Sequence, residues 1–206
     1  MMNLRPLAFV PLLIFSAAVL RAEGEPKETA TAVVNRVQAA LIDVMKNAEK
    51  LGINGRIEKL DPMVRSTHKL ATVARVALGK NWAQLTEAQR NAFVDKFSTL
   101  VIVTYASNFN GFSGESFTVT SEQPRERGQV LVRTNLTKSD GGKVELDYVL
   151  ERVADSWQII NIIADGVSDL ALKRQEYESV ISKEGFDGLM KKLSQKIEDI
   201  KVTPGH

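Results

Sequence analysis

The chain has 206 residues, no cysteine, and 27 Lys and Arg against 25 Asp and Glu, for a formal net charge of +2. The lack of thiols argues against a disulfide scaffold, thiolate metal sites and a lipid-anchored lipoprotein. The two histidines, His68 and His206, are too far apart in sequence to predict a metal site, and no nucleophile motif or phosphate-binding glycine loop is present. We therefore predict no catalytic residue, no metal ligand and no cofactor.

The first 22 residues are predicted to be a secretory signal peptide, followed by one domain over residues 23–206. A basic start is followed by an almost wholly apolar run over residues 6–20 and then by the polar sequence Glu23-Gly24-Glu25-Pro26. An uncleaved anchor is the alternative, because Leu20 stands where a small residue is preferred.

Cleavage would remove Arg5 and Arg21 and no acid, leaving 25 basic residues against 25 acidic ones. A neutral domain has no general electrostatic basis for binding nucleic acid.

Apolar residues at helical spacing predict three helices in the first half of the domain. The first is expected over residues 29–51, with Gly52 as its stop. The second is expected to begin at Asp61-Pro62, in the favoured order of cap and then proline, and to end at Gly79. The third is expected from Thr86 to about Phe109, with Thr86 and Gln89 forming a capping box.

Alternating apolar and polar residues then predict four strands near residues 115–122, 129–138, 143–153 and 156–164. Because the turns between them are short, the strands are expected to form an antiparallel meander. The last strand is apolar on both faces, with Trp157, Ile159 and Ile163 on one and Ile160 and Ile162 on the other. A strand that is apolar on both faces is normally covered by other elements on both faces, or lines a cavity on one of them.

Asp165-Gly166 breaks the apolar run, and Ser168 is expected to cap a helix that returns over the sheet. A last amphipathic helix follows, with Lys191, Lys192 and Lys196 on its solvent side. The expected fold class is therefore α+β, a four-strand antiparallel meander with helices packed around it.

Several of these segments also carry a family resemblance. They are Trp157-Gln-Ile-Ile-Asn161, Asp165-Gly166-Val167-Ser168, Arg174, Glu184-Gly185-Phe186-Asp187-Gly188-Leu189, Leu78-Gly79 before Trp82, Leu85 to Arg90 with Phe93 and Phe97, and Thr104-Tyr105-Ala106. These segments span roughly the whole mature chain in the expected order, and together they resemble the MlaC-type (toluene-tolerance, Ttg2-type) family of periplasmic phospholipid-binding proteins. The chain departs from that pattern at Asn161, where the family often has Asp, and at Asp169-Leu170-Ala171, so a hopanoid-associated branch stays open.

The resemblance implies a curved sheet wrapped by helices around a deep apolar pocket, with a phospholipid or a hopanoid-like lipid as cargo. It also implies a periplasmic location and two partners, an outer-membrane lipoprotein complex and the substrate-binding component of an inner-membrane ABC transporter. The acyl chains are then expected to contact Val73, Phe97, Val101, Tyr105, Phe109, Val132, Val144, Leu146, Tyr148, Ile160 and Ile162.

The residues predicted to dock partners are Lys173, Arg174, Lys191 and Lys192, which would steer the chain toward acidic surfaces. Ordinary solvation of a helix face is the simpler explanation of the lysines, and an ion pair with Glu178 is the alternative for Arg174.

Two other functional classes remain open at this point. One is a periplasmic interaction or assembly module whose apolar faces are merely core. The other is an enzyme, which rests only on the frequency with which α+β domains host active sites.

Overall fold

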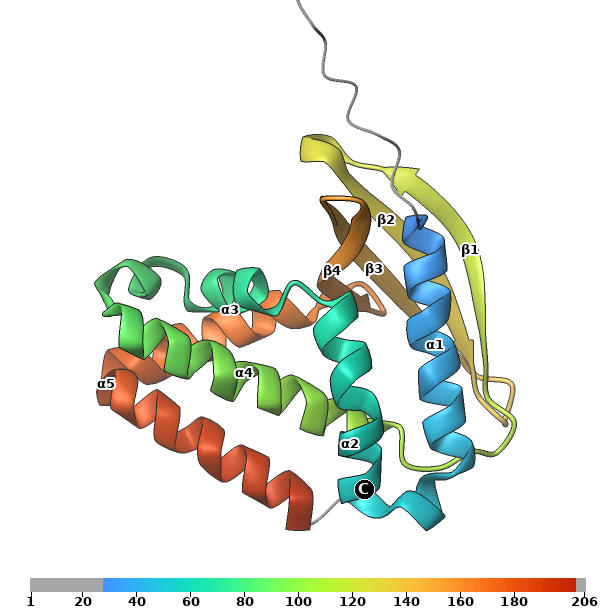
Figure 1. Cartoon of the computed structure of the whole chain (residues 1–206), viewed down its shortest axis with the longest axis horizontal. Coiled ribbons are helices and arrows are strands. Elements are labelled where there is room, and N and C mark those ends of the chain that lie inside the picture. The colour runs from blue at the N-terminus through green and yellow to red at the C-terminus, as the bar shows by residue number, and fades with distance from the viewer. Residues whose placement is uncertain (1–27, 203–206) are drawn as a thin grey trace, which may run out of the picture.

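The computed structural model describes residues 28–202, and the predicted signal peptide and the last four residues lie outside them. The elements are α1 (Ala30–Lys46), α2 (Ala48–Thr67), α3 (Leu70–Leu78), the 3-10 helix η1 (Gly79–Gln84), α4 (Glu87–Asn108), β1 (Ser116–Pro124), the 3-10 helix η2 (Glu126–Gly128), β2 (Gln129–Thr137), β3 (Lys143–Val153), β4 (Ser156–Ala164), β5 (Val167–Ser168) and α5 (Asp169–Val202). The predicted α+β class is confirmed. The sheet with α1 forms one end of the molecule, and α3, α4 and α5 form a helical layer at the other (Figure 1).

The sheet is an antiparallel meander in the order β1-β2-β3-β4-β5. The four predicted strands are confirmed within two residues at each end, and the two-residue β5 was not predicted. The register shifts between Val119 and Ser121 in β1, and again where Val149 pairs with Asn161 but Leu150 pairs with Ile159. Because a bulge bends a strand and increases its twist, these shifts help curve the sheet.

The bulge in β4 corrects the predicted faces of that strand. Ile160 is the extra residue, so Ile159 pairs with Leu150 while Ile162 pairs with Tyr148. Leu150 and Tyr148 lie on one face of β3, and Ile159 and Ile162 therefore face the same side. The prediction placed them on opposite sides because strict alternation cannot reveal an inserted residue.

A first hydrophobic core lies between α1 and the sheet. Val33, Val37 and Leu41 of α1 are completely buried against Val132 and Leu150. Gln38 of α1 is also buried, and its amide donates to the Thr134 hydroxyl at 3.1 Å, which satisfies both polar groups. The part of this sheet face that lies beneath α1 is thereby closed to solvent.

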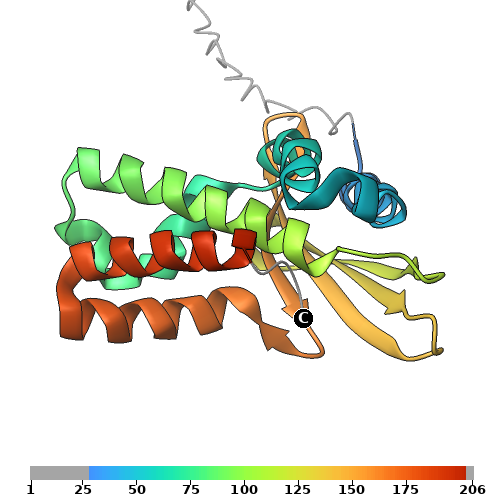
Figure 2. The same cartoon turned by 90° about the horizontal axis from the view of Figure 1, so that it is seen from below.

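A second core joins α3, α4 and α5. Phe93 and Phe97 of α4 pack with Tyr177, Leu189 and Leu193 of α5, and the Phe93 and Tyr177 rings meet edge to face at 6.0 Å. Helix α5 is interrupted at Gly185 (φ 71°, ψ −178°), and its two halves run antiparallel to each other (Figure 2). The two predicted C-terminal helices are thus confirmed.

The start of the second helix was predicted wrongly. Helix α1 ends at Lys46, α2 begins at Ala48, and Gly52 (φ 57°) interrupts α2 close to its start. Pro62 then lies inside α2 rather than at a first turn. Both Pro62 and Glu58, whose carbonyl loses its usual partner, are exposed, so water can take the place of the missing hydrogen bond.

A backbone pairing ties the junction between α2 and α3 to the sheet. His68 forms an isolated parallel bridge with Ile159, and the Lys69 N–H donates to the Ile159 carbonyl at 2.9 Å. The Lys69 ammonium also pairs with Glu151 of β3 at 2.8 Å. Chain direction changes at this point, so α3 leaves the sheet and enters the helical layer.

Two of the predicted caps are confirmed. The Thr86 hydroxyl accepts from the Gln89 N–H at 3.3 Å, while the Gln89 side chain accepts from the Thr86 N–H at 2.9 Å. The Ser168 hydroxyl accepts from the Ala171 N–H at 3.2 Å and so caps α5. Within residues 28–202, no helix is both long and apolar enough to cross a membrane.

Gly79, between α3 and η1, supplies a test of how the helical layer is held together. Its φ of 54° with ψ of −128° is strained for any residue with a Cβ, and an added Cβ would lie 3.0 Å from Nε of Arg174. We expect Gly79→Ala to lower the free energy of unfolding by roughly 1–3 kcal/mol in a urea titration. Gly111→Ala is the control, since its added Cβ meets nothing within 4 Å and its φ is not positive; an equal loss in both variants would contradict the argument.

Candidate functional site

A cavity of about 600 Å³ lies between the sheet and the helical layer. Its wall is formed by side chains of α3 and α4, the cavity-facing sides of β2, β3 and β4, and the first turns of α5. The lining residues are His68, Leu70, Val73, Phe97, Val101, Thr104, Tyr105, Asn108, Phe109, Leu136, Lys138, Val144, Leu146, Tyr148, Ile159, Ile160, Asn161, Ile162, Ala164, Asp169, Leu170 and Lys173. The volume falls within the range of about 300–1,000 Å³ that is typical of ligand pockets.

The structure brings together ten of the eleven residues predicted to contact acyl chains. These ten are Val73, Phe97, Val101, Tyr105, Phe109, Val144, Leu146, Tyr148, Ile160 and Ile162. They come from α3, α4, β3 and β4, so the cavity is assembled from segments far apart in the sequence. Their contact with a lipid stays a prediction.

Val132 is the exception, and it does not line the cavity. Val132 lies on the same face of β2 as Leu136, and Leu136 lines the cavity. The Val132 side chain, however, is completely buried in the core beneath α1. Alternation predicts which face of a strand is apolar, and it cannot predict how far along that face α1 extends. Val132 is therefore a core residue.

Helix α4 lines the cavity with side chains from successive turns, and the last two of these side chains are aromatic. Phe97 and Val101 lie toward its middle, followed by Tyr105 and Phe109 one and two turns further on. The Tyr105 and Phe109 rings stack at 6.1 Å, and Phe109 meets Phe117 of β1 at 6.4 Å. This aromatic row joins the cavity wall to the outer strand of the sheet.

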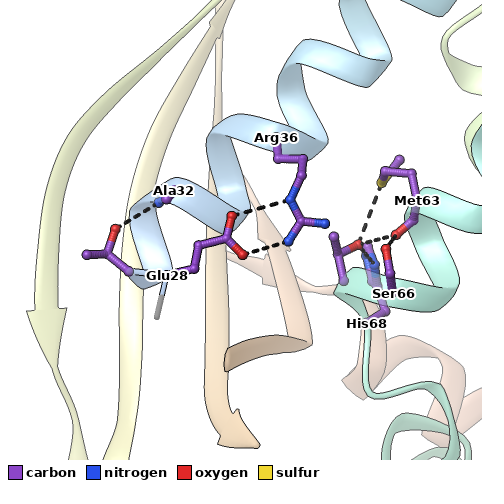
Figure 3. A network of polar contacts seen from close by, with 8 residues as sticks. Glu28, Ala32, Arg36, Met63, Ser66 and His68 are labelled. Carbon is purple, nitrogen blue, oxygen red and sulfur yellow. Dashed lines mark hydrogen bonds and ion pairs between the residues drawn. The ribbon is translucent and has the colours of Figure 1, made fainter. Parts of the chain in front are cut away.

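A buried polar network interrupts the apolar wall, and the sequence did not reveal it. The Thr67 hydroxyl lies 2.7 Å from the Met63 carbonyl and 2.9 Å from Nδ1 of His68. Figure 3 shows Met63 and His68 in this part of the network. Nε2 of His68 in turn lies 3.0 Å from the Tyr105 hydroxyl. The spacing of His68 from Tyr105 in the chain predicts no contact, because the contact depends on the α2–α3 junction being held at β4.

The hydrogen-bond donors of this network follow from counting protons. Thr67 has one hydroxyl proton, and the Met63 carbonyl can only accept, so Thr67 donates to Met63. His68 must then donate from Nδ1 to Thr67, which leaves Nε2 as the acceptor of the Tyr105 hydroxyl proton. Burial favours the uncharged forms: it lowers the pKa of His68 to about 4 and raises the pKa of Tyr105 well above its usual value.

The mouth of the cavity is the part of its lining where the residues are exposed to solvent. Four lining residues are exposed, namely Asn108, Lys138, Ala164 and Asp169. Lys173, one turn after Asp169 on α5, is half-buried beside them and pairs with Asp169 at 2.5 Å. The cavity thus has an apolar interior and a polar, charged mouth.

The residues predicted to dock partners do not form one patch. The Lys173 ammonium belongs to the cavity mouth, and Arg174 lies beside Gly79 instead of pairing with Glu178. Glu178 pairs with Lys80 at 2.6 Å, and that bond lowers the pKa of its carboxyl. Lys191 and Lys192 are exposed on the second half of α5, where Lys192 pairs with Glu184 at 2.9 Å.

No group of three or more His, Cys, Asp or Glu side chains that could hold a metal ion occurs within residues 28–202. What the cavity offers is apolar surface, one satisfied polar network and a charged mouth. This arrangement suits an amphipathic ligand with apolar chains and a polar end.

The chain is similar to several known proteins. The model of the MlaC protein family matches residues 35–195. The intermembrane phospholipid transport system binding protein MlaC of Haemophilus influenzae is 24% identical over 122 residues, 57% of each chain, and the toluene tolerance protein ttg2D of Pseudomonas putida is 21% identical over 102 residues, 50% of this chain and 47% of the relative. The chain thus matches about half the length of these two relatives.

The same fold occurs in a solved structure. The phospholipid-binding protein from Ralstonia solanacearum, determined in complex with a phospholipid, has a TM-score of 0.74 and 22% sequence identity. The match covers 83% of this chain and 98% of that one.

The His68 network predicts a pH dependence of stability. The unfolded chain binds a proton on this histidine near pH 6.5 and the folded protein only near pH 4, so its contribution is complete above pH 6.5 and declines as the pH falls toward 4. Between pH 7 and pH 4 we expect the wild type to lose about 3 kcal/mol more unfolding free energy than His68→Gln. Urea titrations across this pH range measure the difference, and parallel curves for the two proteins would contradict it.

Proposed function

The chain belongs to the MlaC family, and from this premise we propose that it is a periplasmic lipid carrier, not an enzyme, that holds the acyl chains of a phospholipid in its cavity. The observation that carries the proposal is the apolar interior of about 600 Å³ with its charged mouth. The structural neighbour from Ralstonia solanacearum, which was solved with a phospholipid, adds support through its shared fold.

The energetics of acyl chains explain why such a carrier is useful. Burying one methylene group stabilises it by about 0.8 kcal/mol, so a chain of about sixteen carbons gains on the order of 12 kcal/mol over exposure to water. A free phospholipid therefore crosses an aqueous compartment very slowly, and a protein that encloses its chains removes this barrier. The same magnitude makes unaided release slow, so a partner must open the cavity or compete for the lipid.

We propose two such partners, an outer-membrane lipoprotein complex and the substrate-binding component of an inner-membrane ABC transporter. The name of the Haemophilus influenzae relative, which places that protein in an intermembrane phospholipid transport system, supports the idea. A signal peptide over residues 1–22 would deliver the chain to the periplasm between them. A hopanoid-like lipid is the alternative cargo of the same cavity.

The cavity and the core supply a matched pair of variants for testing the carrier function. Leu146 lines the cavity and Val132 lies in the core beneath α1, on adjacent strands of one sheet. We expect native mass spectrometry to detect bound phospholipid on the wild type, and Leu146→Asp to lose most of it while staying folded, because an unpaired charge in an apolar cavity opposes the acyl chains.

Val132→Asp should instead unfold the protein, since burying an unpaired carboxylate there costs several kcal/mol and leaves no cavity to relieve it. Circular dichroism separates the two outcomes, and Glu145→Gln, on the solvent side of β3, is the control for both. A wild type without lipid, or a folded Leu146→Asp variant that keeps its full lipid load, would contradict the proposal.

The exposed lysines of the second half of α5 are proposed to steer the encounter with the inner-membrane partner. Lys191 is exposed and makes no ion pair within the described residues, so its field reaches solvent. We expect Lys191→Glu to slow association with the substrate-binding component at low salt, and the defect to shrink as ionic strength rises. Stopped-flow or surface binding kinetics over a salt series measure it; Lys50→Glu, an exposed lysine on α2, is the control and should show no such defect.

A further inference from the structure

Three charged residues line the cavity at its mouth. Lys138 follows β2, and Asp169 and Lys173 lie one turn apart at the start of α5, and all three line the same cavity. The lining therefore carries two ammonium groups and one carboxylate on the side where the apolar interior opens to water. A lipid whose acyl chains fill the interior would present its polar end on this side.

The two lysines differ in their freedom. The side chain of Lys173 is only 18% exposed and is held by the Asp169 carboxylate at 2.5 Å, whereas the Asp169 side chain is 61% exposed. Lys138 is exposed, and within residues 28–202 its ammonium has no ion-pair or hydrogen-bond partner. One lysine is thus partly desolvated and paired with a carboxylate that water can reach, and the other is unpaired.

A neighbouring amide adds a further donor. Asn161 of β4 lines the cavity, and its Oδ1 accepts from the Ser168 hydroxyl at 3.1 Å. This bond fixes the orientation of the side chain, so the amide NH2 is the group left to donate. Ser168 is itself held because its hydroxyl accepts from the Ala171 N–H.

Resting on the proposed carrier function, we propose that Lys138 and Lys173 bind the phosphodiester of the cargo headgroup. When the cavity is empty, the Asp169 carboxylate takes the place of the phosphodiester and forms an ion pair with Lys173. The lipid phosphate enters by exchanging with the carboxylate, so Lys173 keeps an anionic partner in both states. A carboxylate bound to Lys173 resembles a phosphate in charge and in its ability to accept hydrogen bonds.

The exchange has a consequence for release. A half-buried ammonium that lost its phosphate without replacement would be left unpaired, which would add a barrier to departure of the lipid. Because Asp169 lies one turn before Lys173 on the same helix, it takes up the ammonium as the phosphate leaves. The mouth thereby binds a phosphodiester lipid in preference to a neutral lipid, and the binding of the phosphodiester lipid stays reversible.

The test compares two ligands with the same acyl chains. Purified, delipidated protein is incubated with vesicles containing phosphatidylglycerol or, separately, the matching diacylglycerol, and bound lipid is quantified by mass spectrometry after the vesicles are removed. We expect Lys173→Met and Lys138→Met each to lower phosphatidylglycerol loading roughly three- to tenfold and to leave diacylglycerol loading unchanged. Asp169→Asn should instead raise phosphatidylglycerol loading, because the lipid phosphate then has no carboxylate competing with it for Lys173.

Two controls keep the outcomes apart. Lys183→Met removes an exposed lysine from the same helix that does not line the cavity, and inorganic phosphate in excess tests whether a free anion alone competes at the mouth. Equal loading of phosphatidylglycerol by wild type and by both lysine variants would overturn the inference while leaving the carrier function intact. A wild type that loads neither lipid would instead count against the carrier function, and a fall in both lipids would show that the lysines act on the fold rather than on the phosphate.

Discussion

The cavity depends on one short pairing, in which the Lys69 N–H donates to the Ile159 carbonyl beside the bridge between His68 and Ile159. This pairing anchors the α2–α3 junction to β4 and directs α3 away from the sheet (Figure 1). Helix α1 packs on one part of the sheet, and α3 and α5 contact the sheet at β4. The cavity lies between these two regions, each packed around its own hydrophobic core, and neither core fills it.

The buried arginine shows how polar groups help to hold this arrangement. Arg56 of α2 is 5% exposed, and its guanidinium donates to the Ala106 carbonyl at 2.7 Å and the Ala48 carbonyl at 3.0 Å. It joins the end of α4 to the first turn of α2, across the interruption at Gly52. Burial lowers the pKa of Arg56, although the group stays charged at any physiological pH. Sequence periodicity could not identify this role, because it predicts that an arginine in a largely polar segment lies on the surface.

Local patterns predicted the strands and the caps at Thr86 and Ser168, since each of these depends on residues close together in the chain, whereas most of the cavity wall was expected from the family resemblance. The errors at Val132 and in the faces of β4 occurred where distant segments decide the outcome. Whether Val132 faces a helix or a cavity depends on the length of α1, and the faces of β4 depend on the bulge at Ile160. The His68–Tyr105 contact likewise depends on the anchoring of the α2–α3 junction, and no spacing within either segment contains that information.

The interruption of α5 at Gly185 divides the helix into two halves that lie side by side (Figure 2). The first half carries Asp169 and Lys173 at the cavity mouth, and the second carries the exposed Lys191 and Lys192. Both halves pack into one core through Tyr177, Leu189 and Leu193, but the outer face of the second half does not line the cavity, so substitutions there leave the lining of the mouth unchanged. The residues proposed to contact the partner and those proposed to contact the lipid headgroup therefore lie on different halves of a single helix-forming segment.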